Sequence, residues 1–351
     1  MISKLKYLNN KKLIRRIVKN PYLLINVVGS YFANYFKVIY NPFLPISADI
    51  EPAAVCNFKC KMCQVTYWNR KPQSITLEDF KKVLDQIPTL MKVKIQGMGE
   101  PFLNRELIEI IQYANKKNLI ISTTTNASLL TESKCQELIN SGIDEVLVSI
   151  DGGTKETYEK IRVQGNFDIL KRNVGNLVKA RGNKKTPIIR FWIVGMNENI
   201  NELNQIIQLT NELKVDNVTL QTSLTFWGKK ELKEKLDGQQ MNTELEEFQK
   251  KLLAAQEISR ELNVDFRIYK DDKLSYNNKC IWPWLKTYIT TDGFVVPCCL
   301  RADPDVLNFG NLKDKTFKEI WNSLGYKSIR KAIKTNQLSD YCKPCYQEHQ
   351  K

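Results

Sequence analysis

Three cysteines, Cys56, Cys60 and Cys63, lie within eight positions of one another in the stretch AVCNFKCKMCQVTYW (54–68). Thiolates bind soft metals and iron–sulfur clusters, and a structural zinc site takes four ligands, usually from two pairs. The only histidine, His349, lies at the far end of the chain, so this loop supplies three ligands by itself. A four-iron cluster can take three thiolates at three irons and leave the fourth iron open. The spacing therefore predicts a reactive iron–sulfur site.

A second group of cysteines lies near the C-terminus, and its members are Cys280, Cys298, Cys342 and Cys345. Two strand-like runs in TYITTDGFVVPCC (287–299) flank Asp292-Gly293, which predicts a hairpin that brings Cys298 back towards Cys280. Four cysteines that end in a CxxC pair suit zinc as well as an iron–sulfur cluster, so both alternatives remain open. Cys299 is an alternative ligand to its neighbour Cys298.

The elements that must position the first three cysteines are strands and helices in regular alternation. Apolar runs predict strands over 47–53, 92–97, 119–125, 144–151, 187–194 and 215–222, with helical patterns between them. Six such units predict an α/β fold with a parallel sheet and outer helices, either doubly wound or a partial barrel. Loops gather at the C-terminal ends of the strands in both folds. The cysteine loop, which follows the first strand, is therefore expected at the reactive edge.

The chain divides into three expected segments. A basic and apolar helical segment covers residues 1–46, and the barrel covers residues 47–240. The third segment, residues 241–351, begins with a polar linker helix and continues as a small α+β module. This module holds the predicted hairpin and two short helices near 316–324 and 326–335, and all cysteines of the second group lie in it.

The loop CNFKCKMC resembles the CxxxCxxC cluster loop of the radical S-adenosylmethionine (SAM) superfamily, whose open iron binds SAM. Further motifs stand at successive strand ends. GMGEP (97–101) is similar to the family's GGEP motif, TTTNA (123–127) to TNG, VSIDG (148–152) to the fourth-strand motif, and IVGMNE (193–198) to GxIxGxxE. The resemblance implies a partial (βα)6 TIM-like barrel, followed by the small C-terminal module.

By the same resemblance, the SAM contacts are expected from Met62, Gly97, Gly99, Glu100, Pro101, Asn126, Ser149, Asp151, Gly195 and Glu198. Met62 stands where the family often has an aromatic residue, and Ala127 replaces a glycine. Two interpretations of Arg190, inside the fifth strand, remain open. It is either a partner for the SAM carboxylate or a strand arginine that points outward. The implied reaction is reductive cleavage of SAM to a 5′-deoxyadenosyl radical, which abstracts hydrogen from a substrate. No catalytic acid or base is assigned.

The C-terminal module resembles the SPASM and twitch modules, which bind auxiliary clusters through a Cx(9–15)Gx4C signature. The resemblance implies two [4Fe–4S] clusters. One is bound by Cys56, Cys60 and Cys63 together with SAM, and the other is held by Cys280, Cys298, Cys342 and Cys345 and serves electron transfer. An electron donor such as a flavodoxin or ferredoxin is the implied protein partner.

Three possible functions of the protein are compared. The first expectation is oxidation or rearrangement of a small polar, sugar- or aminocyclitol-like molecule, because a single auxiliary cluster resembles dehydrogenases of that kind. The alternative is a peptide- or protein-modifying maturase. Such enzymes often carry a leader-binding domain larger than residues 1–45, which ranks this reading second. A non-enzymatic zinc-binding scaffold ranks third, because the cysteine loop and the GMGEP motif are intact.

The charge of the chain is concentrated at its N-terminus. Of the net +15, the first 47 residues contribute eight cations and no acid, which leaves +7 for the remainder. That mild excess does not predict a nucleic-acid groove. An uncharged, aromatic-rich run over 20–36 follows the basic stretch. Residues 1–45 are therefore expected either to lie on an anionic membrane surface or to dock on the main domain.

The odd number of cysteines, nine, and their clustering favour the reducing cytoplasm.

Overall fold

A computed structural model describes residues 11–224, 230–236, 238–241, 245–269, 280–340 and 342–343. Its centre is a nine-stranded sheet with the order β7-β6-β5-β4-β3-β2-β1-β8-β9. The strands are β1 Ser47–Ile50, β2 Lys92–Ile95, β3 Ile120–Thr125, β4 Glu145–Ser149, β5 Ile188–Val194, β6 Asn217–Gln221, β7 Asp265–Tyr269, β8 Lys286–Ile289 and β9 Val295–Val296. Strands β1 to β7 pair in parallel, β8 pairs in parallel with β1, and β9 is antiparallel to β8.

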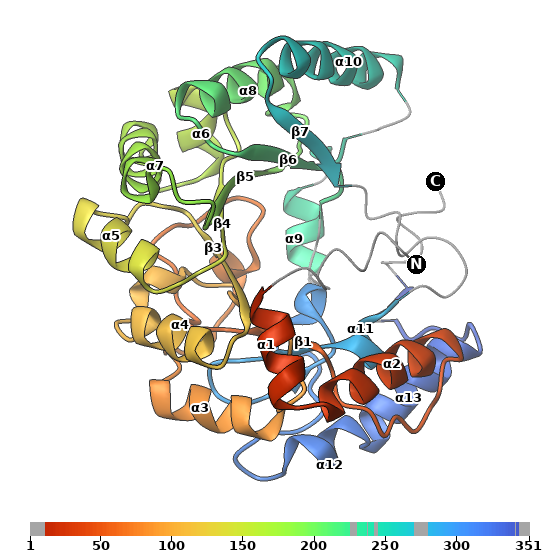
Figure 1. Ribbon diagram of the computed structural model, residues 1–351. Coiled ribbons are helices and arrows are strands. Elements are labelled where there is room, and N and C mark those ends of the chain that lie inside the picture. The colour runs from red at the N-terminus through yellow and green to blue at the C-terminus, as the bar shows by residue number, and fades with distance from the viewer. Residues whose placement is uncertain are drawn as a thin grey trace.

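The expected partial barrel is confirmed. The six predicted strands are present as β1 to β6, and among the described residues no pairing joins the two ends of the sheet, β7 and β9, so the barrel stays open on one side. Helices cover the outer face of the sheet, as Figure 1 shows for the arc from α3 to α8. They are α3 Leu77–Gln86, α4 Leu107–Lys116, α5 Glu132–Asn140, α6 Lys155–Ile161, α7 Phe167–Arg181, α8 Leu203–Glu212 and α10 Glu246–Glu261.

Local sequence explains where several of these helices begin. Thr76, Thr131, Thr154 and Asn166 precede α3, α5, α6 and α7, and each side chain accepts a hydrogen bond from the third backbone N–H that follows. A capping side chain satisfies a donor that the helix itself leaves unpaired, which contributes about 1 kcal/mol. The chain therefore turns from loop to helix at fixed positions beyond each strand.

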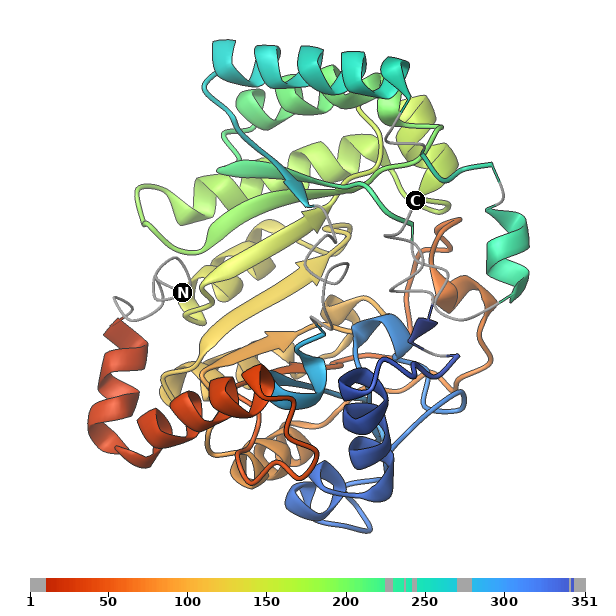
Figure 2. The same cartoon turned by 90° about the vertical axis from the view of Figure 1, so that its right-hand side faces the viewer.

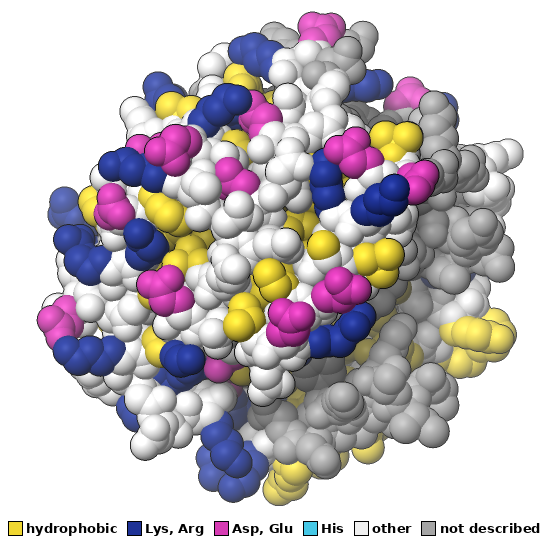
Figure 3. All heavy atoms as spheres, turned by 90° about the horizontal axis from the view of Figure 1, so that it is seen from above, with side chains coloured by type: hydrophobic (Ala, Val, Ile, Leu, Met, Phe, Trp, Pro, Cys, Tyr) yellow, Lys and Arg dark blue, Asp and Glu magenta, His cyan; other side chains and the backbone are white. Residues whose placement is uncertain are grey.

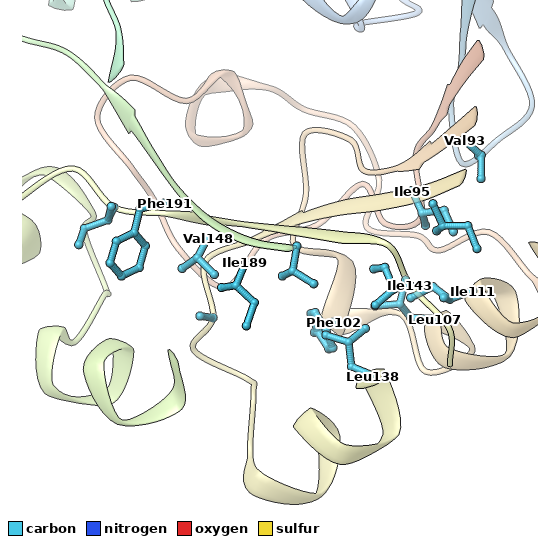
Figure 4. Close-up of a cluster of buried hydrophobic side chains, with 14 of the residues drawn as sticks. Val93, Ile95, Phe102, Leu107, Ile111, Leu138, Ile143, Val148, Ile189 and Phe191 are labelled. Atoms are coloured by element: carbon cyan, nitrogen blue, oxygen red, sulfur yellow. The ribbon is translucent and has the colours of Figure 1, made fainter. Parts of the chain in front are cut away.

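The main core fills the space between the sheet and the outer helices. Alternate strand residues point into it, because successive side chains of a strand face opposite sides. Figure 4 shows strand residues of this core together with residues of the loops and outer helices, and those labelled are Val93, Ile95, Phe102, Leu107, Ile111, Leu138, Ile143, Val148, Ile189 and Phe191. The other side chains of each strand face the barrel interior.

The C-terminal module is continuous with the sheet. Its hairpin is present as β8 and β9, and Gly293 turns it with a φ of +90°, a conformation that favours glycine. The remaining elements are α11 Trp282–Leu285, the 3-10 turn Cys299–Arg301, α12 Phe317–Trp321 and α13 Leu324–Lys334. Since α10 leads to β7 and β8 borders β1, the sheet runs across the boundary expected at residue 240.

Two helices precede the barrel, α1 Lys11–Lys19 and α2 Tyr22–Tyr35. Helix α2 packs against α11 of the C-terminal module, and Figures 1 and 2 show α1 at the end of α2 that lies away from this contact. In the described part of the chain, no helix is long and apolar enough to cross a membrane.

Figure 3 shows another face, seen from above, where basic and acidic side chains are interspersed, so this face presents no single-sign patch.

Candidate active site

The cysteine loop follows β1 at the C-terminal edge of the barrel, as its position in the sequence predicts. The backbone N–H groups of Lys59 and Lys61 donate to the carbonyls of Val163 and Ile161, at 3.0 and 3.1 Å, which fastens the loop to the end of α6. Cys60 is buried, whereas Cys56 and Cys63 are half-buried. The 3-10 turn Gln64–Tyr67 follows directly and closes the loop.

Arg162 joins this loop to the fourth strand. Its Nε donates to Oδ2 of Asp151 at 2.7 Å, and its Nη1 lies 3.8 Å from Sγ of Cys60. Oδ1 of Asp151 accepts from the backbone N–H of Val194 at 2.7 Å. Burial by itself lowers the pKa of Arg162, but the carboxylate of Asp151 and the sulfur of Cys60 raise it above its ordinary value. A buried, permanent positive charge therefore stands beside one cluster thiol.

Glu100 and Asn126 connect the second and third strand ends. The Glu100 carboxylate is buried and accepts from Oγ1 of Thr125 at 2.7 Å and from the backbone N–H of Asn126 at 2.8 Å. The Asn126 amide in turn donates to Oδ1 of Asn57 at 3.0 Å and lies 4.0 Å from Sγ of Cys56. Burial raises the pKa of Glu100, and the hydrogen bonds from Asn126 and Thr125 oppose that shift. The structure thus brings both predicted residues to the cysteine loop.

The glycines of GMGEP allow a close approach of two backbones. A Cβ on Gly99 would stand 2.3 Å from the carbonyl oxygen of Ala53 and 2.4 Å from that of Val55, so no side chain fits there. A Cβ on Gly97 would meet the side chain of Glu51 at 2.3 Å. The N–H of Glu100 donates to the carbonyl of Val55 at 2.9 Å, and Pro101 opens the 3-10 turn Pro101–Leu103. This motif therefore fixes the strand that enters the cysteine loop.

The remaining predicted SAM contacts lie in the cysteine loop and at the ends of β4 and β5. Met62 packs in an apolar cluster with Cys60, Ile161 and Met196, which follows Gly195 at the end of β5. Glu198 forms ion pairs of 3.0 Å with Lys61 of the loop and with Lys160. Burial opposes the ionised form, but the hydrogen bonds from these two lysines lower the pKa of Glu198. Ser149 ends β4 and faces the barrel interior beside this region.

Arg190 lies closer to the N-terminal ends of the barrel strands than the other predicted SAM contacts do. It points inward, so it is not the outward-facing arginine that one reading expected, and its Nη2 forms an ion pair of 3.0 Å with Glu145, the first residue of β4. Four further residues of β5 follow Arg190 before the strand ends. At about 3.3 Å per residue, this places its backbone on the order of 13 Å below the cysteine edge. The structure does not bring it to the other predicted SAM contacts.

The donor set fits an iron–sulfur cluster. Burial raises the pKa of Cys56 to about 11 and that of Cys63 to about 12, so these thiols are protonated until a metal displaces the proton. Within the described residues, no three His, Cys, Asp or Glu side chains converge on a single-metal site. A four-iron cluster does not need such convergence, because each thiolate binds a different iron.

Two buried polar groups beside the loop also point to a bound group. In the described part of the chain, neither the amide of Gln64, which follows Cys63, nor the hydroxyl of Tyr158 has a hydrogen-bond partner. The charges of Cys60 and Asp151 act on the Tyr158 hydroxyl, which places it near the loop. Buried polar groups without partners are rare and often mark an unfilled ligand site. These residues therefore fit a cluster with an organic cofactor beside it.

The C-terminal cysteines are partly described. Cys280 precedes α11, and Cys298 follows β9, so the β8–β9 pairing returns the chain as the hairpin predicts. Burial raises the pKa of Cys342, and the charge of nearby Arg301 partly offsets this shift, which places Cys342 close to the turn after Cys298. Cys299 packs with Tyr288, Val296 and Met98. Cys345 lies outside the described residues.

A buried ion pair ties this module to the barrel. Arg70, which follows the cysteine loop, donates to both carboxylate oxygens of Glu51 at 3.2 and 2.9 Å, and its Nη2 lies 3.3 Å from Oδ1 of Asp292 in the β8–β9 turn. Glu51 also accepts from the backbone N–H of Thr291 at 3.1 Å. The end of β1, the segment after the loop and the hairpin therefore share one hydrogen-bonded network.

Sequence reasoning missed Arg162, Asn57 and Arg70. Arg162 belongs to no motif, and only the fold shows that it pairs with Asp151, so no local signal was available. Asn57 stands inside the cysteine loop, where an amide side chain between two cysteines could have been singled out. Arg70 lies two residues beyond an aromatic pair, Tyr67-Trp68, and the spacing alone does not indicate an ion pair.

Comparison with protein families supports the same two units. The model of the radical SAM superfamily matches residues 50–210. A second model, SPASM, described as an iron-sulfur cluster-binding domain, matches residues 280–346.

Several characterised proteins resemble the chain over most of its length. A PqqA peptide cyclase of Gluconobacter oxydans is 26% identical over 311 residues, which cover 87% of this chain and 83% of the relative. A tungsten-containing aldehyde ferredoxin oxidoreductase cofactor-modifying protein of Pyrococcus furiosus is 24% identical over 318 residues, 84% of this chain and 86% of the relative. Among solved structures, Streptococcus suis SuiB bound to its precursor peptide SuiA has a TM-score of 0.67 at 17% identity and covers 82% of this chain and 67% of SuiB. This last likeness concerns the fold.

Proposed function

Because the chain belongs to the radical SAM superfamily and carries a SPASM domain, we propose that it is a peptide-modifying radical SAM enzyme. Cys56, Cys60 and Cys63 would hold the [4Fe–4S] cluster that binds SAM. With the cluster and SAM bound, the site would supply a one-electron reduction of SAM to methionine and a 5′-deoxyadenosyl radical, which would take a hydrogen atom from the substrate. The observation that carries this proposal is the assembly of the three cysteines with Asn126 and Arg162 at one end of an open barrel.

The residues around the loop orient it and keep water out. Arg162 holds Cys60 through a charge-assisted contact and is itself fixed by Asp151. Phe58, Met62 and Met196 bury the side of the loop that faces the end of α6. Glu198 pairs with both Lys61 of the loop and Lys160 of α6, and so holds the loop against the end of that helix. A radical reaction needs such shielding, because water and stray hydrogen donors would quench it.

The barrel interior supports a peptide substrate. The inward residues near the ends of β4, β5 and β6 are Ser149, Trp192, Val194, Thr219 and Gln221, none of which is charged. Trp192 contacts Tyr269 of β7, with ring centroids 5.3 Å apart. Hydroxyl, amide and aromatic groups suit peptide bonds and uncharged side chains. A phosphorylated metabolite needs cations, and the inward-pointing Arg190 is already paired with Glu145. Among the described residues, β7 pairs only with β6, so this edge of the sheet carries no further strand.

The relatives also support the peptide over the small polar molecule that the sequence placed first. A protein named PqqA peptide cyclase matches both units of this chain, so the order barrel and SPASM module occurs in a peptide-modifying enzyme. The peptide ranked second in the sequence only because the N-terminal segment is shorter than a leader-binding domain. The interior of an open barrel can recognise a peptide without such a domain, so a short N-terminal segment does not exclude a peptide substrate.

We further propose that the SPASM domain carries one auxiliary [4Fe–4S] cluster, held by Cys280, Cys298, Cys342 and Cys345. Its role would be to accept the electron left after hydrogen abstraction, and a ferredoxin or flavodoxin would supply the electron for SAM cleavage. Arg301 stands close to Cys342 and carries a positive charge that favours bound thiolates. The same charge would also favour thiolate ligation of zinc, so the preference for a cluster rests on the match of this segment to an iron-sulfur cluster-binding domain.

The first experiment is an iron, sulfide and zinc count on anaerobically reconstituted protein, with 5′-deoxyadenosine assayed after addition of SAM and dithionite. About eight irons per chain and deoxyadenosine formation are expected for two four-iron clusters. About four irons with one zinc would make the C-terminal module structural, and no iron with no SAM cleavage would refute the enzyme function.

The peptide proposal is tested separately. Short peptides encoded beside the gene are incubated with the reconstituted enzyme and SAM, and a mass change is sought by mass spectrometry. A change that requires SAM and disappears with Cys60→Ala supports the proposal. Stimulation of SAM cleavage by sugars or nucleotides, together with no effect of any peptide, would contradict the proposal and indicate a small polar molecule as the substrate.

A further inference from the structure

Helix α2 is docked with its apolar side outward. Its buried residues are Leu23, Asn26, Gly29, Ser30 and Ala33, which are mostly small or polar. The opposite side is large and apolar, and it is made of Leu24, Ile25, Val28, Tyr31, Phe32 and Tyr35. Ile25, Val28 and Tyr35 expose 61%, 62% and 79% of their surface. These six residues, named the α2 outer face, recur at helical spacing along one stripe.

The inner contacts show that this orientation is built into the fold. The Asn26 amide donates to the carbonyl of Leu44 at 2.9 Å and accepts from its N–H at 2.9 Å, and the Ser30 hydroxyl donates to the same carbonyl at 3.1 Å. A Cβ on Gly29 would stand 2.2 Å from the ring of Phe43. The helix cannot rotate its outer face inward without losing these bonds and meeting that ring.

Helix α1 adds fixed positive charge beside this face. Lys12 forms an ion pair of 2.7 Å with Asp144, and Arg16 donates to the carbonyls of Lys117 and Pro88, each at 2.7 Å, so these two side chains hold α1 on the barrel. Lys11, Arg15 and Lys19 are exposed. The first 47 residues contain no acidic side chain, so nothing in that segment neutralises the three cations.

We propose that the α2 outer face and the exposed cations of α1 bind the surface of an anionic phospholipid membrane. Aromatic and aliphatic side chains beside lysine and arginine suit the boundary between headgroups and acyl chains. With 14 residues, α2 is about 21 Å long and so lies on the bilayer instead of crossing its core of about 30 Å. Lysine is depleted at protein–protein interfaces, which favours lipid over a second copy of the chain. This inference is independent of the substrate and of SAM chemistry.

The test is sedimentation of the full-length protein with vesicles. Binding is expected to vesicles that contain phosphatidylserine, to be weaker with phosphatidylcholine alone, and to fall with added salt. Ile25→Ser/Val28→Ser/Phe32→Ser should weaken binding at least tenfold. Lys11→Gln/Arg15→Gln/Lys19→Gln should weaken binding to the anionic vesicles about fivefold for each charge removed.

Matched controls carry the same changes elsewhere. Leu245→Ser/Leu253→Ser/Leu324→Ser removes three apolar side chains that are 55%, 54% and 82% exposed, just before α10, on α10 and on α13. Lys82→Gln/Lys179→Gln/Lys250→Gln removes exposed lysines of α3, α7 and α10. Wild-type protein that stays in the supernatant with anionic vesicles would overturn the proposal, as would equal loss of binding in the controls. A dimer in sedimentation velocity that only the α2 variant dissociates would assign the face to a second copy instead.

Discussion

The Nη1 of Arg162 lies 3.8 Å from Sγ of Cys60, although the two residues are 102 positions apart in the chain. Asp151, which follows β4, accepts a hydrogen bond from the same guanidinium, so Arg162 connects a carboxylate at the end of β4 with the Cys60 thiol of the cysteine loop. A positive charge fixed in this place favours thiolate over thiol and compensates the negative charge that cluster ligation brings into a buried site.

Arg162→Gln is expected to abolish SAM cleavage and to lower the free energy of unfolding by about 3 to 5 kcal/mol, because it leaves the buried Asp151 carboxylate without its partner. The double variant Asp151→Asn/Arg162→Gln removes both charges and should regain much of that stability. Deoxyadenosine formation and chemical denaturation are measured on both. SAM cleavage that returns with stability in the double variant would reduce Arg162 to a structural role.

Cys60→Ala is expected to lose about four of the irons and all deoxyadenosine formation, while the C-terminal cluster remains, because the two cysteine groups bind separately. Cys135→Ala is the matched control. Cys135 is buried in α5, with its Sγ 3.7 Å from the carbonyl of Leu130, and lies outside the site. Iron counts and absorbance spectra distinguish the two variants. Full iron content in Cys60→Ala would contradict the ligand assignment.

Gly99→Ala should impair cluster loading, because its Cβ would meet the carbonyls of Ala53 and Val55 and push the strand away from the loop. Gly175→Ala offers a direct comparison. A Cβ at Gly175, inside α7, meets nothing within 4 Å, so this change should stabilise the protein by about 0.5 to 1 kcal/mol. Melting temperature and iron content are measured for both. Normal iron content in Gly99→Ala would show that the backbone adapts at no functional cost.

The stability of the metal-free protein should fall at high pH. Burial raises the pKa of Cys56 to about 11 and that of Cys63 to about 12, from ordinary values near 9. The unfolded chain therefore loses these protons first as pH rises, and the folded state loses stability progressively between about pH 9 and 12. Denaturant unfolding of the metal-free protein across this range tests the prediction. Cys56→Ser/Cys63→Ser should have a flatter profile, and an unchanged profile would contradict the assignment.

The chemistry-bearing parts of the site were predictable because they are local. The cysteine loop, the GMGEP glycines and the Asp292-Gly293 turn each follow from a few adjacent residues. Regular alternation of such runs with helical patterns was enough to predict the partial barrel. The structure adds the reason for each glycine, such as the backbone approach at Gly99.

The parts that escaped prediction depend on packing between distant segments. Strand β7 has alternating exposure because it borders the open side, so DFRIY lacks the apolar run expected of a parallel strand. The apolar run over 20–36 shows which residues are apolar, but which side of α2 faces the body depends on Phe43 and Leu44. The contact of Arg162 with Cys60 likewise exists only once α6 meets the loop.

The pairing of β8 with β1 would set the distance between the two proposed clusters, and with it the distance that an electron crosses between them. Strand β1 leads into the first cysteine loop, and β8 leads through its hairpin to Cys298, so both cysteine groups are attached to neighbouring strands in register from Ser47 with Lys286 to Ile50 with Ile289. Separating the module from the barrel would break this ladder and the Arg70 network. We therefore expect the distance between the two proposed clusters to change little during turnover, because both cysteine groups are attached to paired strands.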